Sequence, residues 1–327
     1  MKRPWLAPFT PLYAAGLALR NLRIANGWEP IRRLRFPVIS IGNLSTGGAG
    51  KTPLTVVLAS ALTQRGLNVD VLSRGYGRNN RQPSLVDPNG TAEEFGDEPL
   101  LIARNTGVPV YVARQRYEAG LLAEAAIADP EKPAIHLLDD GFQHRQLHRD
   151  VDILLLNRQD WDDRLLPAGN LREALRAAYR ADVIAIPKDD PAFETELRAW
   201  GWHGPIWRLT RKMEIPDVDG PVLAFCGIAR PEQFFAGLEA AGAQIAARIA
   251  FPDHHPYTTT DFDRIKTAAH QSAAAALITT EKDQVRLGAL ASDFPDSLIL
   301  ITANLRVEIE GERTAIEWLV ERAAPPP

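Results

Sequence analysis

The sequence predicts an α/β protein with a mostly parallel sheet and a second, smaller α/β domain. Short apolar runs alternate with helical stretches along almost all of the 327 residues, which is typical of parallel α/β architecture. The chain is long enough to bury two cores, and 45% of its side chains are hydrophobic. A third observation is that the first 28 residues differ in composition from everything that follows, which indicates a separate N-terminal element.

The expected elements can be taken in chain order. Six apolar runs are predicted to be strands, at residues 37–41, 69–73, 108–113, 134–139, 151–157 and 182–187. Helices fit between them, notably at 52–64, 117–128 and 171–178. The pattern loosens at 200–221, where Gly, Pro and Trp are frequent, so we place a domain boundary there. This divides the chain into an N-terminal helix at 1–28, a larger domain at 29–210 and a smaller domain at 211–327.

The smaller domain repeats the alternation without a glycine-rich loop of its own. Its expected strands lie at 222–227, 245–250, 276–280 and 297–302, and its helices begin at Pro231, Thr260 and Glu312. The formal charge of −4 argues against a chain that coats nucleic acid, and we expect no nucleic-acid partner and no obligate protein partner. A single cysteine, Cys226, cannot form an internal disulfide, which fits a reducing cytoplasm.

The N-terminal segment is apolar but short. Residues 4–19 carry no charge, and arginines flank the segment on both sides. A membrane span needs about 20 apolar residues, and Pro8 and Pro11 interrupt this one. The pattern indicates a helix that lies in a bilayer interface, with aromatic residues at headgroup depth and arginines on anionic phosphates. The alternative is a helix packed on the domain core.

A glycine-rich stretch has the form of a phosphate-binding loop. It lies between the strand predicted at 37–41 and the helix predicted at 52–64, which is the context that such a loop needs. The usual G-x-x-x-x-G-K-[ST] pattern has its first glycine where this chain has Ser45, but three later glycines remain where the backbone must approach an anion. The motif predicts a nucleotide site and a sheet of the P-loop NTPase type. Its residues are Ser45, Thr46, Gly47, Gly48, Ala49, Gly50, Lys51 and Thr52.

Mg²⁺ is expected beside this loop. Lys51 would reach the β- and γ-phosphates, and the Thr52 hydroxyl would bind the ion. A second, acidic ligand should come from a neighbouring strand, and the run at 134–139 ends in Asp139, followed by Asp140. Both emerge at the carboxyl edge of the sheet, where such folds bind ligands. The alternative is a strand-end Asp that caps the turn before Gly141.

Two acids follow a glycine at 96. Asp97 and Glu98 precede Pro99, and a proline in this position favours the start of a helix. One of the two could be the general base that accepts a proton from an attacking hydroxyl. They could equally be an N-cap Asp and a first-turn Glu, which stabilise a helix without any chemistry.

A proline-bounded loop at 251–257 concentrates Asp253, His254 and His255. Two histidines and an acid on one loop suggest a metal site or a histidine that reaches into an interdomain cleft. No Cys or third His lies at ligand spacing, which disfavours zinc. Several arginines follow strand ends, where their forks suit phosphate groups or form surface salt bridges. They are Arg74, Arg114, Arg116 and Arg172.

Together these motifs closely resemble those of one family, the tetraacyldisaccharide 4′-kinases, which are the lipid A 4′-kinases of Gram-negative bacteria. The motifs occur in order and cover the chain nearly from end to end. They are SxGNLSTGGAGKTP from Ser40, VLSRGYGR from Val71, GDEP from Gly96, LLDDGFQHR from Leu137, LPAGNLRE from Leu166, FPDHHPY from Phe251 and TTEKD from Thr279. The family's loop is also one with Ser in the first position.

The resemblance implies transfer of the γ-phosphoryl group of ATP to the 4′-hydroxyl of tetraacyldisaccharide 1-phosphate in lipid A biosynthesis, with ATP and Mg²⁺ at the site. It implies that Asp97 is the catalytic base and that His254 assists it, although the adjacent His255 leaves the choice of histidine open. The implied metal ligands are Thr52 and Asp139, with Asp140 and Glu173 beside them. The residues expected near the phosphates or the sugar are Arg74, Glu98, Arg116, Gln143, His144 and Arg172.

An enzyme whose lipid substrate cannot leave the bilayer must come to it. The resemblance therefore favours the interfacial helix and a monotopic or peripheral protein on the cytoplasmic face of the inner membrane. A membrane-cycling ATPase of the partitioning type is the alternative, but its loop reads K-G-G-x-G-K-T, and Thr46 stands here in place of the first lysine. A GTPase would need an N-K-x-D motif, which residues 281–283 do not provide.

Overall fold

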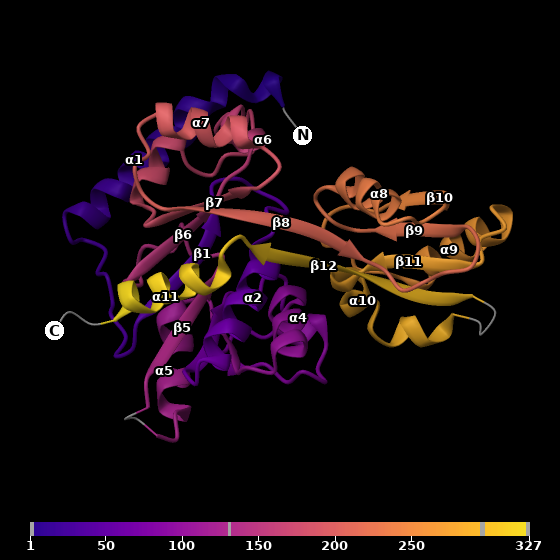
Figure 1. Cartoon of the computed structure of the whole chain (residues 1–327), viewed down its shortest axis with the longest axis horizontal. Helices are drawn as coiled ribbons and strands as arrows, with labels where there is room; N and C mark the ends of the chain where they lie inside the picture. The colour runs from indigo at the N-terminus through magenta and orange to yellow at the C-terminus, as the bar shows by residue number, and fades with distance from the viewer. Residues whose placement is uncertain (1–2, 130–131, 295–297, 325–327) are drawn as a thin grey trace.

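The structure is a computed structural model, and it describes residues 3–129, 132–294 and 298–324. Two lobes of unequal size lie side by side, joined by two long strands (Figure 1). The larger lobe contains the first seven strands, which are β1 (Val38–Asn43), β2 (Asn68–Ser73), β3 (Ser84–Leu85), β4 (Val110–Val112), β5 (Ala134–Asp139), β6 (Val151–Leu155) and β7 (Val183–Pro187). The other five are β8 (Ile206–Glu214), β9 (Val222–Cys226), β10 (Ile245–Ala250), β11 (Ala276–Thr280) and β12 (Ile299–Ile309).

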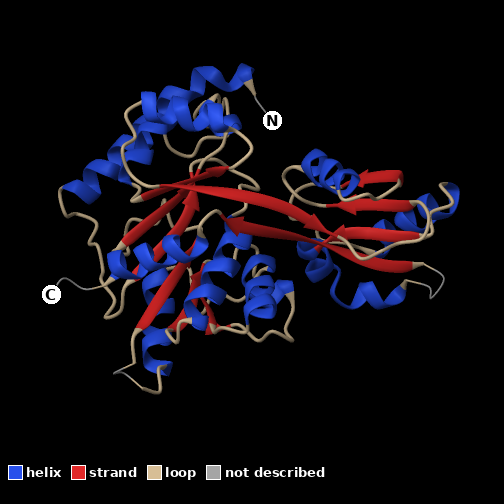
Figure 2. Cartoon of the chain, viewed as in Figure 1, coloured by secondary structure: helices blue, strands red, loops and turns tan. Residues whose placement is uncertain are grey.

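Within the described residues one twelve-stranded sheet runs through both lobes, in the order β10-β9-β11-β12-β8-β7-β6-β1-β5-β2-β4-β3. All neighbours pair in parallel except β3 with β4 and β8 with β12. The predicted α/β class and mostly parallel sheet are therefore confirmed. Helices cover both faces of the sheet in each lobe (Figure 2). Parallel strands need such cover because both of their faces must be buried.

The helices of the larger lobe are α1 (Thr10–Ala25), α2 (Lys51–Gln64), α3 (Ala92–Phe95), α4 (Asp97–Thr106), α5 (Arg116–Ala126), α6 (Arg158–Trp161), α7 (Pro191–Ala199) and α11 (Glu312–Ala323). Those of the smaller lobe are α8 (Pro231–Ala240), α9 (Thr259–Gln271) and α10 (Glu281–Leu287). Short 3₁₀ turns lie at Pro4–Phe9, Leu175–Arg180 and Gly288–Asp293.

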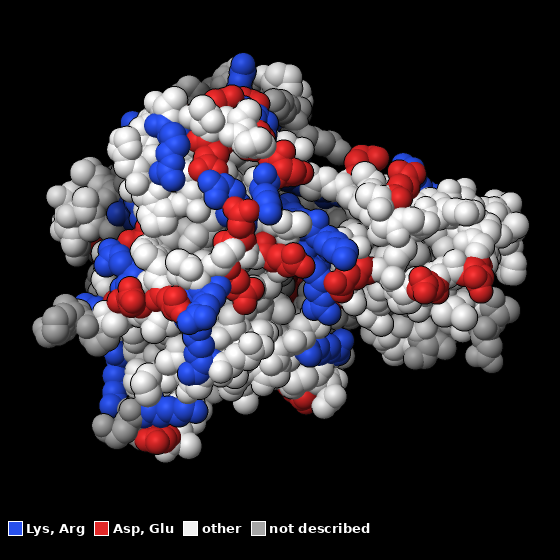
Figure 3. All heavy atoms as spheres, in the orientation of Figure 1, with Lys and Arg blue, Asp and Glu red and all other residues white. Residues whose placement is uncertain are grey.

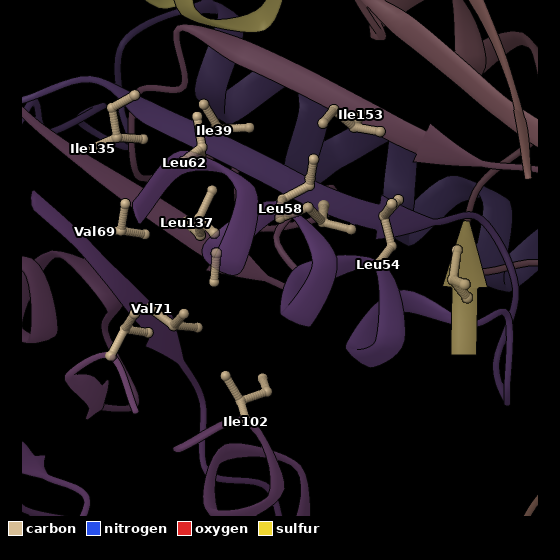
Figure 4. Packing of buried hydrophobic residues seen from close by; sticks show 14 of the residues in the cluster. Ile39, Leu54, Leu58, Leu62, Val69, Val71, Ile102, Ile135, Leu137 and Ile153 are labelled. Atoms are coloured by element: carbon tan, nitrogen blue, oxygen red, sulfur yellow. The ribbon is translucent and has the colours of Figure 1, made fainter. Parts of the chain in front are cut away.

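The largest apolar core lies between the sheet of the larger lobe and the helices α2, α4 and α11. Leu54, Leu58 and Leu62 recur on one side of α2 and point at Ile39 of β1 and its neighbours (Figure 4). This spacing places one stripe of the helix on the sheet, and each fully buried leucine contributes roughly 2 kcal/mol. The same core contains Ile316 and Leu319 of α11. The larger lobe is therefore built from two parts of the chain, although the sequence assigned residues after 210 to the smaller domain.

Two strands cross between the lobes. β8 pairs with β7 through Ile206 to Leu209, and from Leu209 onward it pairs with β12. β12 begins beside β11 in the smaller lobe and ends beside β8. The segment at 200–221, in which we expected a loose boundary, thus contains a nine-residue strand. Its outward-facing Arg208 and Thr210 interrupt the apolar run, so the strand alternates between exposed and covered side chains.

A predicted helix at 171–178 is wrong. Leu171 forms isolated bridges with Ser45 and Leu165, and the backbone N–H of Arg172 donates to the carbonyl of Leu44 at 2.7 Å. These contacts with the phosphate loop hold residues 171–174 in a non-helical path, and only the 3₁₀ turn at Leu175–Arg180 follows. Tertiary contacts override the helical propensity of an alanine-rich segment here. The predicted strand at 297–302 begins at Ile299, since residue 297 lies outside the described residues.

The N-terminal helix α1 lies over the larger lobe (Figure 1). Most of its apolar side chains are exposed or only partly buried. Its one buried residue is Ile24. Trp5 and Leu12 are each 74% exposed, and Phe9, Leu19 and Leu22 are exposed as well. The helix therefore adds little to the core. No helix in residues 3–129, 132–294 and 298–324 combines the length and the apolar character that a membrane span requires.

Candidate active site

The phosphate loop joins the end of β1 to the start of α2. Gly47 and Gly50 have φ values of +99° and +88°, a region that side-chain-bearing residues rarely occupy. Lys51 opens α2, and its Nζ lies 3.0 Å from Oδ1 of Asn43 and 3.5 Å from Oδ1 of Asp140. The loop thus presents a helix N-terminus and one lysine, which together favour an anion.

Ser45 replaces the usual first glycine without disturbing this loop. Its side chain is buried, and its hydroxyl accepts a hydrogen bond from Nδ2 of Asn43 at 3.1 Å. The next residue, Thr46, donates its backbone N–H to the carbonyl of Asn170 at 2.8 Å. The hydroxyl is therefore an anchor for the loop, and this position needs no special backbone angle.

Asp139 ends β5 directly beside α2. It is 1% exposed, and Thr55 donates its hydroxyl to Oδ1 at 3.3 Å. Burial, together with the nearby carboxylates of Glu98 and Asp140, raises the pKa of Asp139 to about 7. Asp139 and the Thr52 hydroxyl line the same cavity and are oxygen donors of the kind that Mg²⁺ prefers. Thr52 and Asp139 fit Mg²⁺, because a divalent cation would neutralise the buried carboxylate of Asp139 and its acidic neighbours.

Asp140 is held by cations instead. Burial alone would raise its pKa, but Lys51 and Arg172 outweigh that effect and hold the pKa below its usual range. Arg172 forks its carboxylate, with Nη1 3.0 Å from Oδ2 and Nη2 2.9 Å from Oδ1. Glu173 points elsewhere, since both of its oxygens pair with Arg180 at 2.8 and 3.0 Å and it does not line the cavity. The structure therefore does not bring Glu173 to the other proposed metal ligands.

Asp97 and His254 meet across the two lobes. Asp97 starts α4 and is 5% exposed, and Nδ1 of His254 lies 3.1 Å from its Oδ2. Burial would raise the pKa of Asp97, but the hydrogen bond with His254 and the charge of Arg286 hold it well below its usual range. The bond with Asp97 in turn raises the pKa of His254. Tyr76 packs on the histidine ring with 5.2 Å between ring centroids.

His255 points away from this pair. Its Nε2 lies 3.0 Å from Oδ2 of Asp261, and its ring stacks on Phe251 at 4.7 Å. The choice between the two histidines, which the sequence leaves open, is thus decided by geometry in favour of His254 as the neighbour of Asp97.

The other predicted residues line the same cavity from the larger lobe. Burial lowers the pKa of Arg116 to about 10, and burial together with Arg116 lowers that of His144 to about 3. Gln143 donates Nε2 to the carbonyl of Asn43 at 2.8 Å, and its own carbonyl accepts from Arg20 of α1. Arg74 reaches the cavity from the loop after β2. Glu98 pairs with Lys282, which lowers the pKa of the acid.

The cavity residues that the sequence did not predict include three cations, and a fourth unpredicted cation lies behind them. Arg20 comes from the N-terminal helix, Arg211 from β8 donates to the carbonyl of Ala49 in the phosphate loop, and Lys282 comes from α10. Arg286, one turn after Lys282, contacts Asp97. Lys282 belongs to the TTEKD motif and Arg286 follows four residues later, a spacing that is typical of one face of a helix. Nothing in the sequence indicates which acids the two cations contact.

These residues surround one cavity of about 1540 Å³ that lies between the lobes. On the face drawn in Figure 3, charged side chains crowd over the larger lobe and the junction, while the smaller lobe shows few. The phosphate loop, Asp139 and Arg116 line one side, and His254 and Lys282 come from the other lobe. The cavity can therefore hold a nucleotide and a second, anionic substrate together.

A phosphate loop, an acidic group suited to Mg²⁺ and an acid–histidine pair on one cavity define a P-loop phosphotransferase. The profile of a family described as tetraacyldisaccharide-1-P 4′-kinase matches residues 2–324. The chain belongs to this family.

Individual relatives agree with this assignment. A tetraacyldisaccharide 4′-kinase of Koribacter versatilis is 42% identical over 294 residues, which cover 86% of this chain and 88% of the relative. The enzyme of the same name from Aquifex aeolicus is 36% identical and covers 95% and 96%. A crystal structure of LpxK from Aquifex aeolicus, described as an "apo" form in complex with ATP, superposes with a TM-score of 0.76 at 33% identity over 98% of both chains.

Proposed function

We propose that this chain transfers the γ-phosphoryl group of ATP to the 4′-hydroxyl of tetraacyldisaccharide 1-phosphate, forming ADP and a 1,4′-bisphosphorylated lipid. The observation that carries the proposal is that the phosphate loop and the Asp97–His254 pair belong to one interlobe site, with His254 on the wall of the cavity. A partitioning-type ATPase has no use for such a pair. The match of the whole chain to the kinase family also leaves no support for that alternative.

The proton of the 4′-hydroxyl has a route to the Asp97–His254 pair. His254 lines the cavity, whereas Asp97 lies behind it and contacts Nδ1 of the ring. The resemblance implies Asp97 as the base, but this arrangement favours Nε2 of His254 as the atom that accepts the proton while Asp97 stabilises the imidazolium. The hydroxyl oxygen then forms its bond to phosphorus as the bond to the ADP oxygen breaks.

The other residues orient and neutralise the phosphates. Lys51 and the loop backbone would bind the β- and γ-phosphates of ATP, and Thr52 and Asp139 would hold Mg²⁺. When bound, the ion neutralises charge on the phosphate oxygens. Arg74 and Arg116 lie on the same wall and would bind the 1-phosphate of the lipid as a forked, charge-assisted contact.

The N-terminal helix is proposed to seat the enzyme on the membrane that holds its substrate, the cytoplasmic face of the inner membrane. Its exposed apolar side chains are too numerous for a water-facing surface. The helix also touches the site, because the Tyr13 hydroxyl donates to the carbonyl of Arg172 at 3.0 Å and Arg20 lines the cavity. A lipid held at the interface would therefore have its sugar close to the phosphate loop.

The kinase activity is tested by transfer of labelled γ-phosphate from ATP to purified tetraacyldisaccharide 1-phosphate in detergent micelles, with and without Mg²⁺. We expect label in the lipid only when Mg²⁺ is present. Release of phosphate to water with no labelled lipid would refute the proposal.

Membrane seating is tested by the double variant Leu12→Glu, Leu19→Glu. Each leucine buried in the interface should contribute roughly 1.5–3 kcal/mol, so binding to anionic phospholipid vesicles should fall at least about tenfold. Leu121→Glu is the matched control, because Leu121 is an exposed leucine on α5. Equal vesicle binding by both variants and the wild type would show that α1 does not bind the membrane interface.

A further inference from the structure

Arg286 lies in the second turn of α10, at the junction of the lobes, and its guanidinium donates hydrogen bonds to groups of both lobes. Its side chain is 6% exposed. Its guanidinium donates from Nε to Oδ2 of Asp97 at 2.7 Å, and Nη2 contacts the same carboxylate. Nη1 donates to the carbonyl of Gly227 at 2.6 Å and to Oδ1 of Asp283 at 3.0 Å.

The carbonyl of Gly227 connects the arginine with the histidine. It also accepts the backbone N–H of His254 at 3.1 Å. His254 has φ of +56°, a left-handed conformation that is costly for a residue with a side chain and needs such support. One carbonyl at the end of β9 therefore fixes both the backbone of His254 and the guanidinium of Arg286.

Asp283 completes the support from behind. It is fully buried, and its Oδ1 accepts the backbone N–H of Gly227 at 3.0 Å while its Oδ2 accepts the Thr280 hydroxyl at 2.6 Å. The guanidinium is thus held in place by groups of the smaller lobe alone. Its remaining edge faces Asp97, which belongs to the larger lobe.

Lys282 makes a parallel contact one turn earlier on α10. Its Nζ pairs with Oε1 of Glu98, the neighbour of Asp97 at the start of α4. Two cations of one lobe thus face two acids of the other. Asp97 therefore receives its charged partners only when the lobes are together, whereas the phosphate loop takes its shape from the larger lobe and from Arg211 of the connecting strand β8.

We propose that Arg286 is a positioning residue that assembles the Asp97–His254 pair when the lobes close, by fixing Oδ2 of Asp97 against Nδ1 of the ring. The inference rests on the proposed kinase function. Without the guanidinium, Oδ2 keeps only the histidine contact, and Oδ1 keeps the backbone N–H of Glu98 at 2.9 Å. The carboxylate then keeps its bond to the ring but is held less firmly, and the ring is oriented less precisely.

The charges around the pair predict a pH signature. Asp97 faces Arg286, His254 and Lys282, and His254 faces Asp97, Asp253 and Arg286. Arg286 lowers the pKa of both members of the pair. Removing it raises both, so the ionised carboxylate and the neutral imidazole are each lost at a higher pH than in the wild type. Because Nε2 of His254 is the proposed proton acceptor, the acid limb of the rate profile follows the pKa of His254 and moves upward.

The test compares Arg286→Met and Arg286→Lys with the wild type in the lipid-labelling assay between pH 5.5 and 9. Arg208→Met is the matched control, because Arg208 forks Glu194 at 2.7 and 2.9 Å on the surface and lies outside the cavity. We expect kcat of Arg286→Met to fall on the order of 100-fold, with KM for ATP changed less than about threefold and the acid limb moved to higher pH. Arg286→Lys should recover part of kcat.

A purely structural role predicts a different result. It would leave the acid limb of Arg286→Met where it is in the wild type, whatever the loss of folded protein, and this outcome would overturn the inference. So would a wild-type kcat in either variant. If Arg286→Met does not fold, Arg286→Gln decides by the same criterion, because it also removes the charge. Absence of labelled lipid with the wild-type enzyme would instead refute the kinase function itself.

Discussion

The two walls of the cavity are built in opposite ways. On the wall of the phosphate loop, Lys51, Asn43 and Asp140 contact one another within a single lobe and close to one sheet edge. On the other wall, Asp97 and His254 are separated by 157 positions in the chain and come from different lobes. The first wall is built within the larger lobe, with one added contact from Arg211 of the connecting strand β8, whereas the second exists only where the lobes meet. Nucleotide binding and proton removal are therefore expected to respond differently to mutation.

The largest loss of activity is expected from a mutation in the wall of the phosphate loop. Lys51→Met removes the cation that faces Asn43 and Asp140, and with it the charge expected on the β- and γ-phosphates. We expect kcat/KM to fall on the order of 1000-fold in the labelling assay. Lys212→Met is the control, because Lys212 is exposed on β8 outside the cavity. A loss below about tenfold would show that the loop does not need this lysine.

The second wall distinguishes two adjacent histidines. His254→Ala should lower kcat by roughly 100-fold with little change in KM for ATP, because it removes the proton acceptor but leaves the phosphate loop intact. His255→Ala should keep kcat within about threefold and lower the free energy of unfolding by about 1 kcal/mol, since it loses the bond to Asp261. The reverse ranking, measured by steady-state kinetics and urea unfolding, would contradict the assignment.

The smallest effect is expected from His136, which should change the stability of the fold without changing the site. His136 is buried near the middle of β5, three residues before Asp139. Burial lowers its pKa, but the hydrogen bond with Asp70 and the nearby carboxylate of Glu124 outweigh this and raise the pKa to about 9. A folded pKa above the unfolded value of about 6.5 contributes stability in full below pH 6.5, and this stability is lost as pH rises through 9.

Urea unfolding between pH 6 and 9.5 measures this contribution. We expect the free energy of unfolding to fall by a few kcal/mol toward pH 9.5 and the slope to flatten in His136→Gln. A wild-type curve as flat as that of the variant would mean that His136 is neutral in the fold. Because His136 does not line the cavity, the KM for ATP should not follow this titration.

The sequence predicted the first wall better than the second for a physical reason. β1 and β5 are continuous apolar runs that end in polar residues, and a buried parallel strand followed by a glycine-rich loop leaves little choice of geometry. The residues alone left Asp97 open between a base and a helix cap and His254 open between a metal site and a cleft, and only the resemblance to known motifs paired them. Their support by Arg286 depends on how two lobes meet, and no local pattern contains that information.

Two elements show where local patterns fail. β8 was missed because Arg208 and Thr210 face outward between covered residues, so the strand lacks an apolar run. The helix predicted at 171–178 was wrong because the backbone of Leu171 and Arg172 binds the phosphate loop. Both errors fall on segments whose conformation is set by a distant partner. The assignment of residues after 210 to the smaller domain likewise did not foresee that α11 packs on α2.

That last feature has a consequence for how the protein is made. The apolar face of α2 is covered partly by Ile316 and Leu319, which the ribosome adds after the whole smaller lobe. The larger lobe therefore cannot finish its core during synthesis, while the strands and helices of the smaller lobe are complete by the end of β12. In this chain the part translated first becomes stable last, so its nascent form must be kept from aggregating until the final helix emerges.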